Sequence, residues 1–371
     1  MSVVAAAAEF TAPSIDYAAI SPILIVSVAA VLGVLIDAFA PRLLRWPIQV
    51  GVAVLGLIGS FVAVCVVAHT HVLTADGAIA VDGPALFIQA TVALVSLASV
   101  LLIADRSPEV GGGAFVAQAS AVPGSADERR AAGFGRAQTE IFPLLMFAVA
   151  GMELFPAAND LLMLFVALEV LSLPLYLLCG LARRRRLLSQ EAAVKYFLLG
   201  AFSSAFFLYG LALLYGYAGS VSLGDIHDAA ASGQHSDTLL VLGLGLLAVG
   251  LLFKIGAAPF HSWVPDVYQG APTPITAFMA AATKVAAFGA LLRVFYVAFG
   301  GLGWDWRPVA WGVAILTMLV GSVFAVTQTD VKRMLAYSSV AHAGFILVGV
   351  IALNRAGLSG SLFYLLTYGL T

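Results

Sequence analysis

The sequence predicts an all-α polytopic membrane protein with about 11 transmembrane helices, and three observations support this fold class. The chain has 371 residues, of which 61% are hydrophobic and only 10% are charged. Its mean hydropathy is +1.01, whereas a soluble domain carries roughly a quarter charged residues. The apolar residues also fall in runs of about 20, the length of helix that crosses a hydrocarbon core about 30 Å thick.

Ten apolar runs are predicted to be membrane spans, and an eleventh begins near residue 358. The ten runs fall near residues 18–39, 48–69, 84–104, 138–157, 159–182, 192–218, 238–258, 273–299, 308–327 and 335–353. The eleventh is still continuing at Thr371, so we expect a truncated chain. No Lys or Arg precedes the first run, which is therefore expected to be a retained span rather than a signal peptide.

The basic residues of the loops predict how the chain crosses the membrane. Twelve of them fall in alternate loops: Arg42, Arg45, Arg106, Arg129, Arg130, Arg136, Arg183, Arg184, Arg185, Arg186, Lys332 and Arg333. Only Arg307 and Arg355 fall in the opposite loops. Because cytoplasmic loops carry the excess of Lys and Arg, the N-terminus should lie outside. The long segment 105–137, rich in Gly, Ala and Ser, is interpreted as a flexible cytoplasmic loop.

Four ionisable residues within the spans are candidates for function, because a charge at the centre of a membrane helix costs about 2.5–3.5 kcal/mol. Glu169, Lys254 and Lys284 lie deep in their spans, whereas Lys195 lies nearer the cytoplasmic end, four residues after Glu191. Burial favours the neutral form of each group, whereas a glutamate and a lysine that lie close together favour each other's charged form. Groups that approach or separate can therefore form a proton relay. The alternatives are a structural ion pair and, for Lys195, a side chain that reaches the interface.

A proline-rich segment and a histidine add to this pattern. Lys254 is followed by Gly256 and Pro259, so the helix should break there, as membrane helices do where they line a cavity or meet protein. The segment 259–274 contains four prolines and is expected to form a structured loop over the cytoplasmic mouth of the lysine helices. His342 lies about eight residues into a span and could relay protons or join helices by a hydrogen bond.

The sequence gives no sign of a cofactor, metal or nucleic-acid site. Cys65 and Cys179 lie inside apolar runs and cannot supply a zinc or iron–sulfur site. There is no Gly-rich phosphate loop, and the net charge of −2 does not indicate a nucleic-acid partner. We therefore expect no NADH, flavin, metal or iron–sulfur site in this chain.

Three stretches resemble the antiporter-like membrane subunits of respiratory complex I, the type I NADH–quinone oxidoreductase. They are Leu168–Pro174, Lys254–Pro274 together with Thr283-Lys284, and Asp330–His342. The resemblance runs from about residue 140 to 350. The sequence of Asp266–Gly270 is most similar to that of subunit N. It is less similar to subunits L and M or to the related multisubunit sodium/proton antiporters.

The resemblance implies a fold of two inverted five-helix repeats, each with a broken helix, and about 14 membrane helices in a full-length member. This chain would contain an N-terminal three-helix segment (1–104), the cytoplasmic loop (105–137), a first repeat (138–299) and the start of a second (308–371). It also implies that Glu169 pairs with Lys254, that Lys284 is the central relay residue and that Lys195 matches a further lysine of the family. With His342, these are the candidate proton-relay residues.

The implied function is proton transfer from the cytoplasm to the outside, coupled to quinone reduction in other subunits. FMN, iron–sulfur clusters and quinone would belong to those partners, and subunits L and M and small subunits would lie beside this chain in the bacterial plasma membrane. A further relay residue, on the second broken helix, would lie beyond Thr371. Two alternatives remain: a subunit of a multisubunit sodium/proton antiporter, and a membrane scaffold that only anchors its neighbours.

Overall fold

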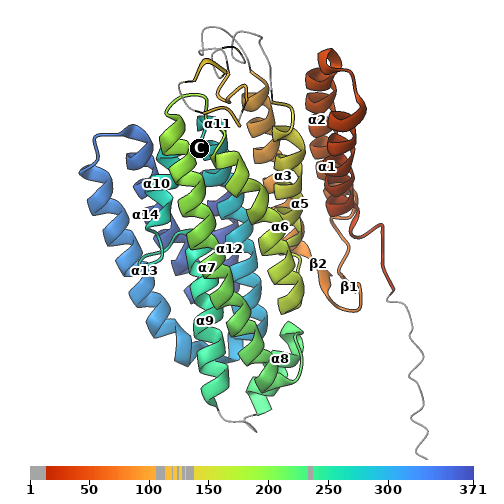
Figure 1. Ribbon diagram of the computed structural model, residues 1–371. Helices are drawn as coiled ribbons and strands as arrows, with labels where there is room; N and C mark the ends of the chain where they lie inside the picture. The colour runs from red at the N-terminus through yellow and green to blue at the C-terminus, as the bar shows by residue number, and fades with distance from the viewer. Residues whose placement is uncertain are drawn as a thin grey trace, which may run out of the picture.

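The computed structural model of the chain describes residues 14–105, 113–118, 120–122, 125–127, 130, 138–232 and 237–371. Most of the expected loop 105–137 lies outside the described residues, including Arg106, Arg129 and Arg136. The described residues form a bundle of long, roughly aligned helices (Figure 1). Within the described ranges, nine helices are long and apolar enough to cross a membrane. The prediction of a helical, multi-pass membrane protein is therefore confirmed.

The helices follow the predicted apolar runs in order. The candidate spans are α1 (Ser21–Phe39), α2 (Arg42–Val66), α3 (Gly83–Ala104), α6 (Leu161–Cys179), α7 (Arg186–Ala218), α9 (Asp237–Ile255), the composite helix Thr273–Ala298, α13 (Gly303–Val326) and α14 (Val331–Ala352). The composite helix consists of α11 (Thr273–Phe278), the π-helix η2 (Met279–Thr283), α12 (Lys284–Arg293) and the π-helix η3 (Val294–Ala298). The shorter helices are α5 (Ile141–Leu154), α8 (Leu223–Ser232), α10 (Trp263–Gly270), α15 (Arg355–Leu370) and the 3₁₀ helix η4 (Gly300–Leu302).

Polar side chains determine where several of these helices begin. Asp82, Asp160 and Asn354 precede α3, α6 and α15, and each accepts a hydrogen bond from the amide three residues further along, at 3.0, 2.6 and 2.8 Å. Such a cap satisfies a backbone donor that has no partner within the helix. Each residue therefore ends a connecting segment and starts a membrane helix.

Glycine residues allow neighbouring helices to approach closely. A Cβ atom at Gly321 of α13 would lie 2.3 Å from the backbone nitrogen of Ala341 in α14. One at Gly151 of α5 would lie 2.4 Å from the backbone nitrogen of Leu171 in α6. Membrane helices associate largely through such close packing of small residues. The pairs α13–α14 and α5–α6 are therefore held in contact by glycine.

The chain breaks between α9 and α10, where Gly256 and Pro259 predict the break. Gly256 has a φ of +75°, a left-handed conformation that favours glycine. The expectation that 259–274 is a loop is wrong in part, because α10 forms an eight-residue helix within it. Pro265 and Pro274 lie in the first turns of α10 and α11, where a backbone donor has no helical partner to lose.

A short β-hairpin, which was not predicted, covers the C-terminal end of α5. Strands β1 (Val72–Thr74) and β2 (Ile79–Val81) pair antiparallel with Leu73 opposite Ala80. The amide of Ala80 donates to the carbonyl of Ala157 at 2.8 Å, and the amide of Asn159 donates to the carbonyl of Ala78 at 2.8 Å. The hairpin is thereby fixed to the segment that joins α5 to α6.

Candidate functional site

Lys254 lies at the end of α9, two residues before Gly256, and is only 5% exposed. Its ammonium group donates to the hydroxyl of Ser172 on α6 at 2.8 Å and to that of Tyr196 on α7 at 3.2 Å. The Tyr196 ring stacks on Trp263 of α10, with ring centroids 4.7 Å apart. The lysine is therefore enclosed where α6, α7, α9 and α10 meet, and its hydrogen-bond partners are neutral hydroxyls.

Glu169 lies on α6 one turn before Ser172 and is half-buried. One of its carboxylate oxygens accepts a hydrogen bond from the hydroxyl of Ser204 on α7 at 2.5 Å. Among the ion pairs formed by described residues, none joins Glu169 to Lys254. Glu169 and Lys254 thus lie on different helices and form no ion pair, and Ser172, one turn after Glu169 on α6, is the residue that Lys254 contacts.

Lys284 follows the π-helix η2 directly and is only 4% exposed. Its ammonium group donates to the hydroxyl of Ser339 on α14 at 2.6 Å and also to the carbonyl oxygen of the same residue. The Tyr368 ring of α15 lies beside it, with the centroid 5.9 Å from the ammonium nitrogen. Short π-helical segments inside α-helices often occur at functional sites. Here the segment precedes the lysine, whose hydrogen-bond partners are again neutral.

His342 lies one turn after Ser339 on α14 and is half-buried. Its Nδ1 atom is 2.6 Å from the hydroxyl of Tyr364, and its ring centroid is 4.7 Å from that of Tyr368. Tyr368 therefore contacts both His342 and Lys284. The structure brings these two candidates together around α15, whereas Glu169 and Lys254 form a separate group on α6 and α9.

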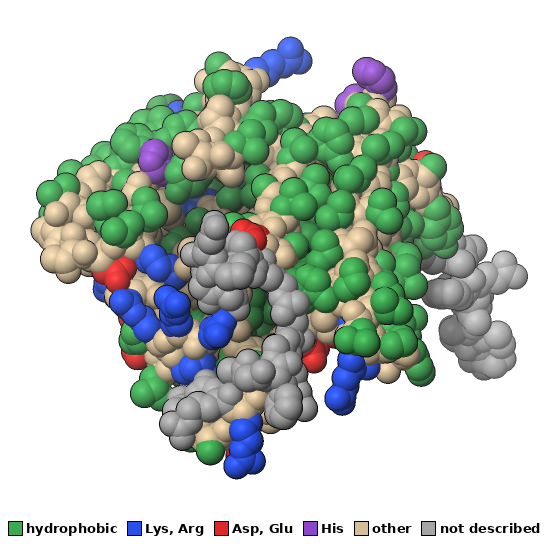
Figure 2. All heavy atoms as spheres, turned by 90° about the horizontal axis from the view of Figure 1, so that it is seen from above, with side chains coloured by type: hydrophobic (Ala, Val, Ile, Leu, Met, Phe, Trp, Pro, Cys, Tyr) green, Lys and Arg blue, Asp and Glu red, His purple; other side chains and the backbone are tan. Residues whose placement is uncertain are grey.

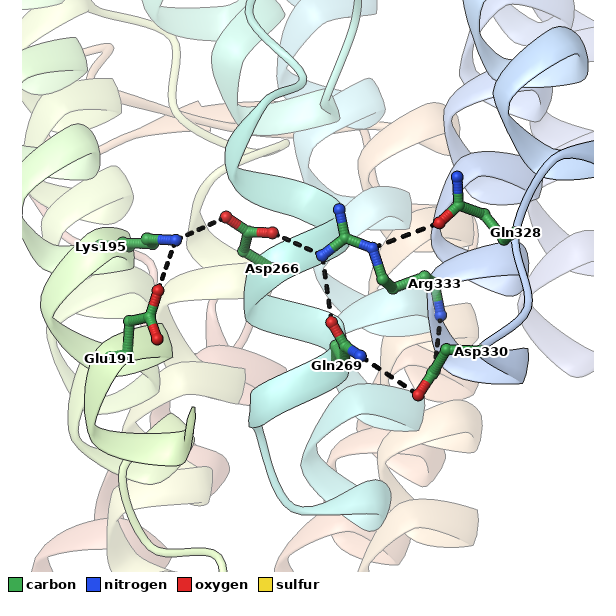
Figure 3. Close-up of polar contacts among 7 residues, drawn as sticks. All are labelled: Glu191, Lys195, Asp266, Gln269, Gln328, Asp330 and Arg333. Carbon is green, nitrogen blue, oxygen red and sulfur yellow. Dashed lines mark hydrogen bonds and ion pairs between the residues drawn. The ribbon is translucent and has the colours of Figure 1, made fainter. Parts of the chain in front are cut away.

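Lys195 lies away from both groups, in a polar network that joins three helices (Figure 3). Its side chain is 41% exposed and contacts Glu191 and Asp266, each at 2.7 Å. Asp266 of α10 also accepts a hydrogen bond from Arg333 of α14 at 2.6 Å. Arg333 in turn donates to Gln269 of α10 at 3.0 Å. The network thus connects α7 to α10 and α10 to α14.

The charges of this network favour ionised carboxylates. Partial burial acts to raise the pKa of Asp266, but hydrogen bonds from Lys195 and Arg333 outweigh it and hold that pKa below the ordinary value of 3.8. Burial likewise acts to raise the pKa of Asp330, in the loop before α14. Hydrogen bonds from the Arg333 amide and from Gln269 lower it overall. Both carboxylates are therefore charged at neutral pH.

A large cavity lies at the same end of the bundle. Its volume is about 680 Å³, and Arg183, Arg184, Arg185 and Lys332 are among the residues that line it. Figure 2 views the molecule from this end and shows Lys and Arg side chains gathered there. We call this the basic end of the molecule. The carboxylates of Asp105 and Asp330 also line the cavity.

Two buried charged residues were missed in the sequence. Glu153, in the last turn of α5, is 0% exposed and lies in an apolar run, so the reasoning that selected Glu169 could have found it. Arg293, at the end of α12, is 8% exposed. It donates to both oxygens of Asp82 at 2.8 Å and to the carbonyl of Pro156 at 2.5 Å. This ion pair ties α12 to the start of α3.

Comparison with known proteins identifies the family of this chain. A family model described as NADH:quinone oxidoreductase/Mrp antiporter, TM, matches residues 158–371. NADH-quinone oxidoreductase subunit N of Rhodococcus opacus (strain B4) is 63% identical, over 99% of this chain and 72% of that protein. Subunit N of Parafrankia sp. (strain EAN1pec) is 65% identical, over 99% of this chain and 70% of that protein. The chain belongs to the NADH-quinone oxidoreductase subunit N family, as its motifs predict.

Solved structures show the same fold. A chain of respiratory complex I from Thermus thermophilus with bound aureothin is 36% identical, with a TM-score of 0.72, over 94% of this chain and 69% of that one. A chain of the Mrp complex from Dietzia sp. DQ12-45-1b has a TM-score of 0.76 but is only 24% identical, over 95% of this chain and 62% of that one. The second likeness shows a shared fold alone.

Proposed function

We propose that this chain is a proton-translocating subunit in the membrane arm of an NADH–quinone oxidoreductase, and that Lys254 and Lys284 carry the proton. The observation that carries this proposal is that both lysines are buried and hydrogen-bonded only to neutral oxygen atoms. Burial without a counter-charge makes the charged form expensive. Hydroxyl and carbonyl partners offset part of that cost. Each lysine can therefore exist with or without its proton.

The other candidates act on these two lysines. Glu169 stabilises the charged form of Lys254 when the two approach, and Ser172, one turn after Glu169 on α6, already accepts a hydrogen bond from Lys254. His342 and Tyr364 extend the polar contacts of the Lys284 group toward α15. Lys195 holds α10 at the basic end through Asp266. The proton enters at that end through the cavity lined by basic side chains.

The proposed function includes an organisation of the chain in two inverted five-helix repeats. The first five-helix repeat covers 138–299 with its broken helix at α9 and α10, and a second repeat begins near 308. We assign α1, α2 and α3 to an N-terminal three-helix segment (1–104), and the segment 105–137 stands between it and the first repeat in the sequence. With α5 and α15 added to the nine candidate spans, this chain crosses the membrane 11 times. The basic end faces the cytoplasm, and the N-terminus lies outside the bacterial plasma membrane.

The chemistry that drives transfer belongs to other subunits. In the described residues, no three His, Cys, Asp or Glu side chains are grouped so as to hold a metal ion. FMN, iron–sulfur clusters and quinone are assigned to partner subunits, with antiporter-like subunits L and M and small subunits beside this chain. The high identity to subunit N proteins favours this function over a sodium/proton antiporter.

Neutral substitutions of the two lysines test the proposal in the intact, membrane-embedded complex. Lys254→Met and Lys284→Met should each lower the number of protons moved per electron, because the replaced side chain cannot carry a proton. The ratio is measured in vesicles during NADH oxidation, with the amount of assembled complex determined in parallel. Arg307→Met removes an exposed charge and is the matched control. An unchanged ratio in both lysine variants would overturn the proposal.

A further inference from the structure

Glu153 is a buried acid that the lysine sites do not use. It lies in the last turn of α5 and is 0% exposed. Its Oε1 atom accepts a hydrogen bond from the hydroxyl of Ser60 on α2 at 2.7 Å. Its Oε2 atom is buried and has no hydrogen-bond partner in the described part of the chain.

The surroundings of Glu153 indicate a neutral carboxylic acid. An ionised carboxylate in an apolar interior needs a counter-charge or several donors, and among the described residues the Ser60 hydroxyl is the single donor to Glu153. The nearby cation is already neutralised, since Arg293 binds Pro156 and both oxygens of Asp82. A proton on Oε2 removes the charge and turns this atom into a donor.

Five other buried side-chain oxygen atoms share this lack of a partner, as judged over the described residues. Three of these five lie on α3 or next to Lys284. They are Oε1 of Gln89 and Oγ of Ser96, both on α3, and Oγ1 of Thr283, next to Lys284. Gln89 also donates from its side-chain nitrogen to the carbonyl of Glu153 at 3.1 Å. Gln89 and Ser96 are seven residues apart and so lie on one face of α3. Buried polar atoms are normally hydrogen-bonded to protein or ordered water, so these positions mark where water binds.

The helices that carry these atoms pack against one another. α3 contacts α5, α12 and η2. A Cβ atom at Gly289 of α12 would lie 2.8 Å from Pro156 and 3.2 Å from Ile88, which neighbour Glu153 and Gln89 in sequence. The α12 helix that starts with Lys284 therefore passes close to Glu153. The β-hairpin, away from the basic end, is attached just beyond, at Ala157.

We propose that Glu153 is a second proton-binding site, and that it exchanges protons with Lys284 through water held along α3 by Thr283, Ser96 and Gln89. Glu153 releases its proton toward the side of the β-hairpin. The Lys284 ammonium then gives up one proton to the water chain, and the last water of the chain returns one to the carboxylate. In each cycle Lys284 therefore loses one proton, and one proton leaves Glu153 toward the side of the β-hairpin. This inference rests on the proposed function, because Lys284 must deliver the proton.

Glu153→Gln in the intact complex tests the site, because Gln matches the shape of the neutral acid but cannot release a proton. We expect assembled complex in near-normal amount and a lower number of protons moved per electron during NADH oxidation by vesicles. Glu140→Gln is the matched control, since Glu140 precedes the same helix at its opposite end and is exposed. An assembled Glu153→Gln complex with the ratio of the control would overturn the proposal.

A second variant covers the case in which Glu153→Gln does not assemble. Ser96→Ala removes one water-binding hydroxyl with little change in volume and should lower the ratio in the same assay. An unchanged ratio in Ser96→Ala would then overturn the water route. If Lys284→Met lowers the ratio and the Glu153 and Ser96 variants do not, this inference alone fails. If Lys254→Met and Lys284→Met also leave the ratio unchanged, the proposed function fails with it.

Discussion

Hydroxyl groups surround both buried lysines of the bundle. Lys254 donates to Ser172 and Tyr196, and Lys284 donates to Ser339. Hydrogen bonds to charged groups contribute about 1.5–3 kcal/mol each, which offsets part of the cost of burying an ammonium group. A hydroxyl can also accept from the charged lysine and donate to the neutral one. The same contacts therefore serve both protonation states.

Removing one of these hydroxyls should impair turnover without preventing assembly. Tyr196→Phe deletes an acceptor of Lys254 and keeps the ring that stacks on Trp263. Since the lost hydrogen bond is worth about 1.5 kcal/mol or more, we expect proton-coupled NADH oxidation to fall about tenfold. Tyr209→Phe, on the same helix with a 62% exposed side chain, is the control. Equal rates in the two variants would show that the Tyr196 hydroxyl is dispensable.

The sequence identified the residues of these sites but not their contacts. Lys254 and Lys284 are evident because charges are rare in apolar runs. Their partners are serines and tyrosines, which are common in membrane helices and carry no such signal. Whether Glu169 and Lys254 touch at rest depends on the rotation of α6 relative to α9, which spacing within one helix does not determine. The relay role predicted for Lys195 stays a prediction, and the structure places its side chain in contact with Asp266 of α10 at the basic end.

At the scale of elements, the polar network of Figure 3 joins the broken helix to both of its neighbours. Asp266 of α10 receives hydrogen bonds from Lys195 of α7 and Arg333 of α14. A short helix of eight residues has little stability of its own. Its position therefore depends on these contacts and on the packing of Gly270 against Leu188 of α7, where a Cβ atom would lie 2.4 Å from a carbonyl oxygen.

The network should make stability depend on pH in a defined range. Because the pKa of Asp266 is lowered in the folded protein, its contribution is complete above the unfolded value of about 3.9. The contribution is lost as the pH falls through the lower, folded pKa. Asp266→Asn should therefore reduce the thermal stability of the purified complex at pH 7. The difference from the parent should shrink only below about pH 4. A difference that disappears between pH 7 and 5 would contradict this account.

Helix pairing provides a second test at this scale. Gly321→Ala places a methyl group 2.3 Å from the backbone of α14, so α13 and α14 must separate and the complex should lose stability or the subunit. Gly312→Ala, on the same helix with nothing within 4 Å, should be neutral or stabilising by about 0.5–1 kcal/mol. Thermal unfolding in detergent and subunit retention measure the effect. Two variants of equal stability would show that the pair is not held together by this contact.

The elements themselves were largely predictable, with instructive exceptions. The apolar runs gave the order of the helices because an 18–25-residue apolar stretch has few other solutions in a bilayer. Pro265 and Pro274 suggested a loop because proline breaks helix interiors, yet each lies in a first turn, where it is tolerated. The β-hairpin was missed because Val72–Thr74 and Ile79–Val81 are only three residues long and show no alternation that a pattern could reveal.

At the scale of the whole molecule, charge and apolar surface divide the protein into zones. Exposed Leu, Val and Phe residues cover α13, including Leu319, Val323 and Phe324, and such a face suits lipid or a neighbouring subunit. Arg183, Arg184 and Arg185 lie at one end of the bundle, around the large cavity. Because basic loops usually remain in the cytoplasm, the proposed function assigns this end to the cytoplasm and the cavity to the side from which protons are taken.

Thiol labelling from each side of the membrane tests this orientation. Arg184 and Arg355 are exposed, and they follow α6 and α14, two helices that end on opposite sides of the membrane in the proposed topology. In a background with Cys65 replaced by Ala, Arg184→Cys should react with a membrane-impermeant maleimide in inside-out vesicles and stay unlabelled in intact spheroplasts. Arg355→Cys should show the reverse, and the buried Cys179 should label in neither. Labelling of both positions from the same side would contradict the number of crossings between them. An exchanged pattern would place the basic end outside, and the proton would then enter from the opposite side of the membrane.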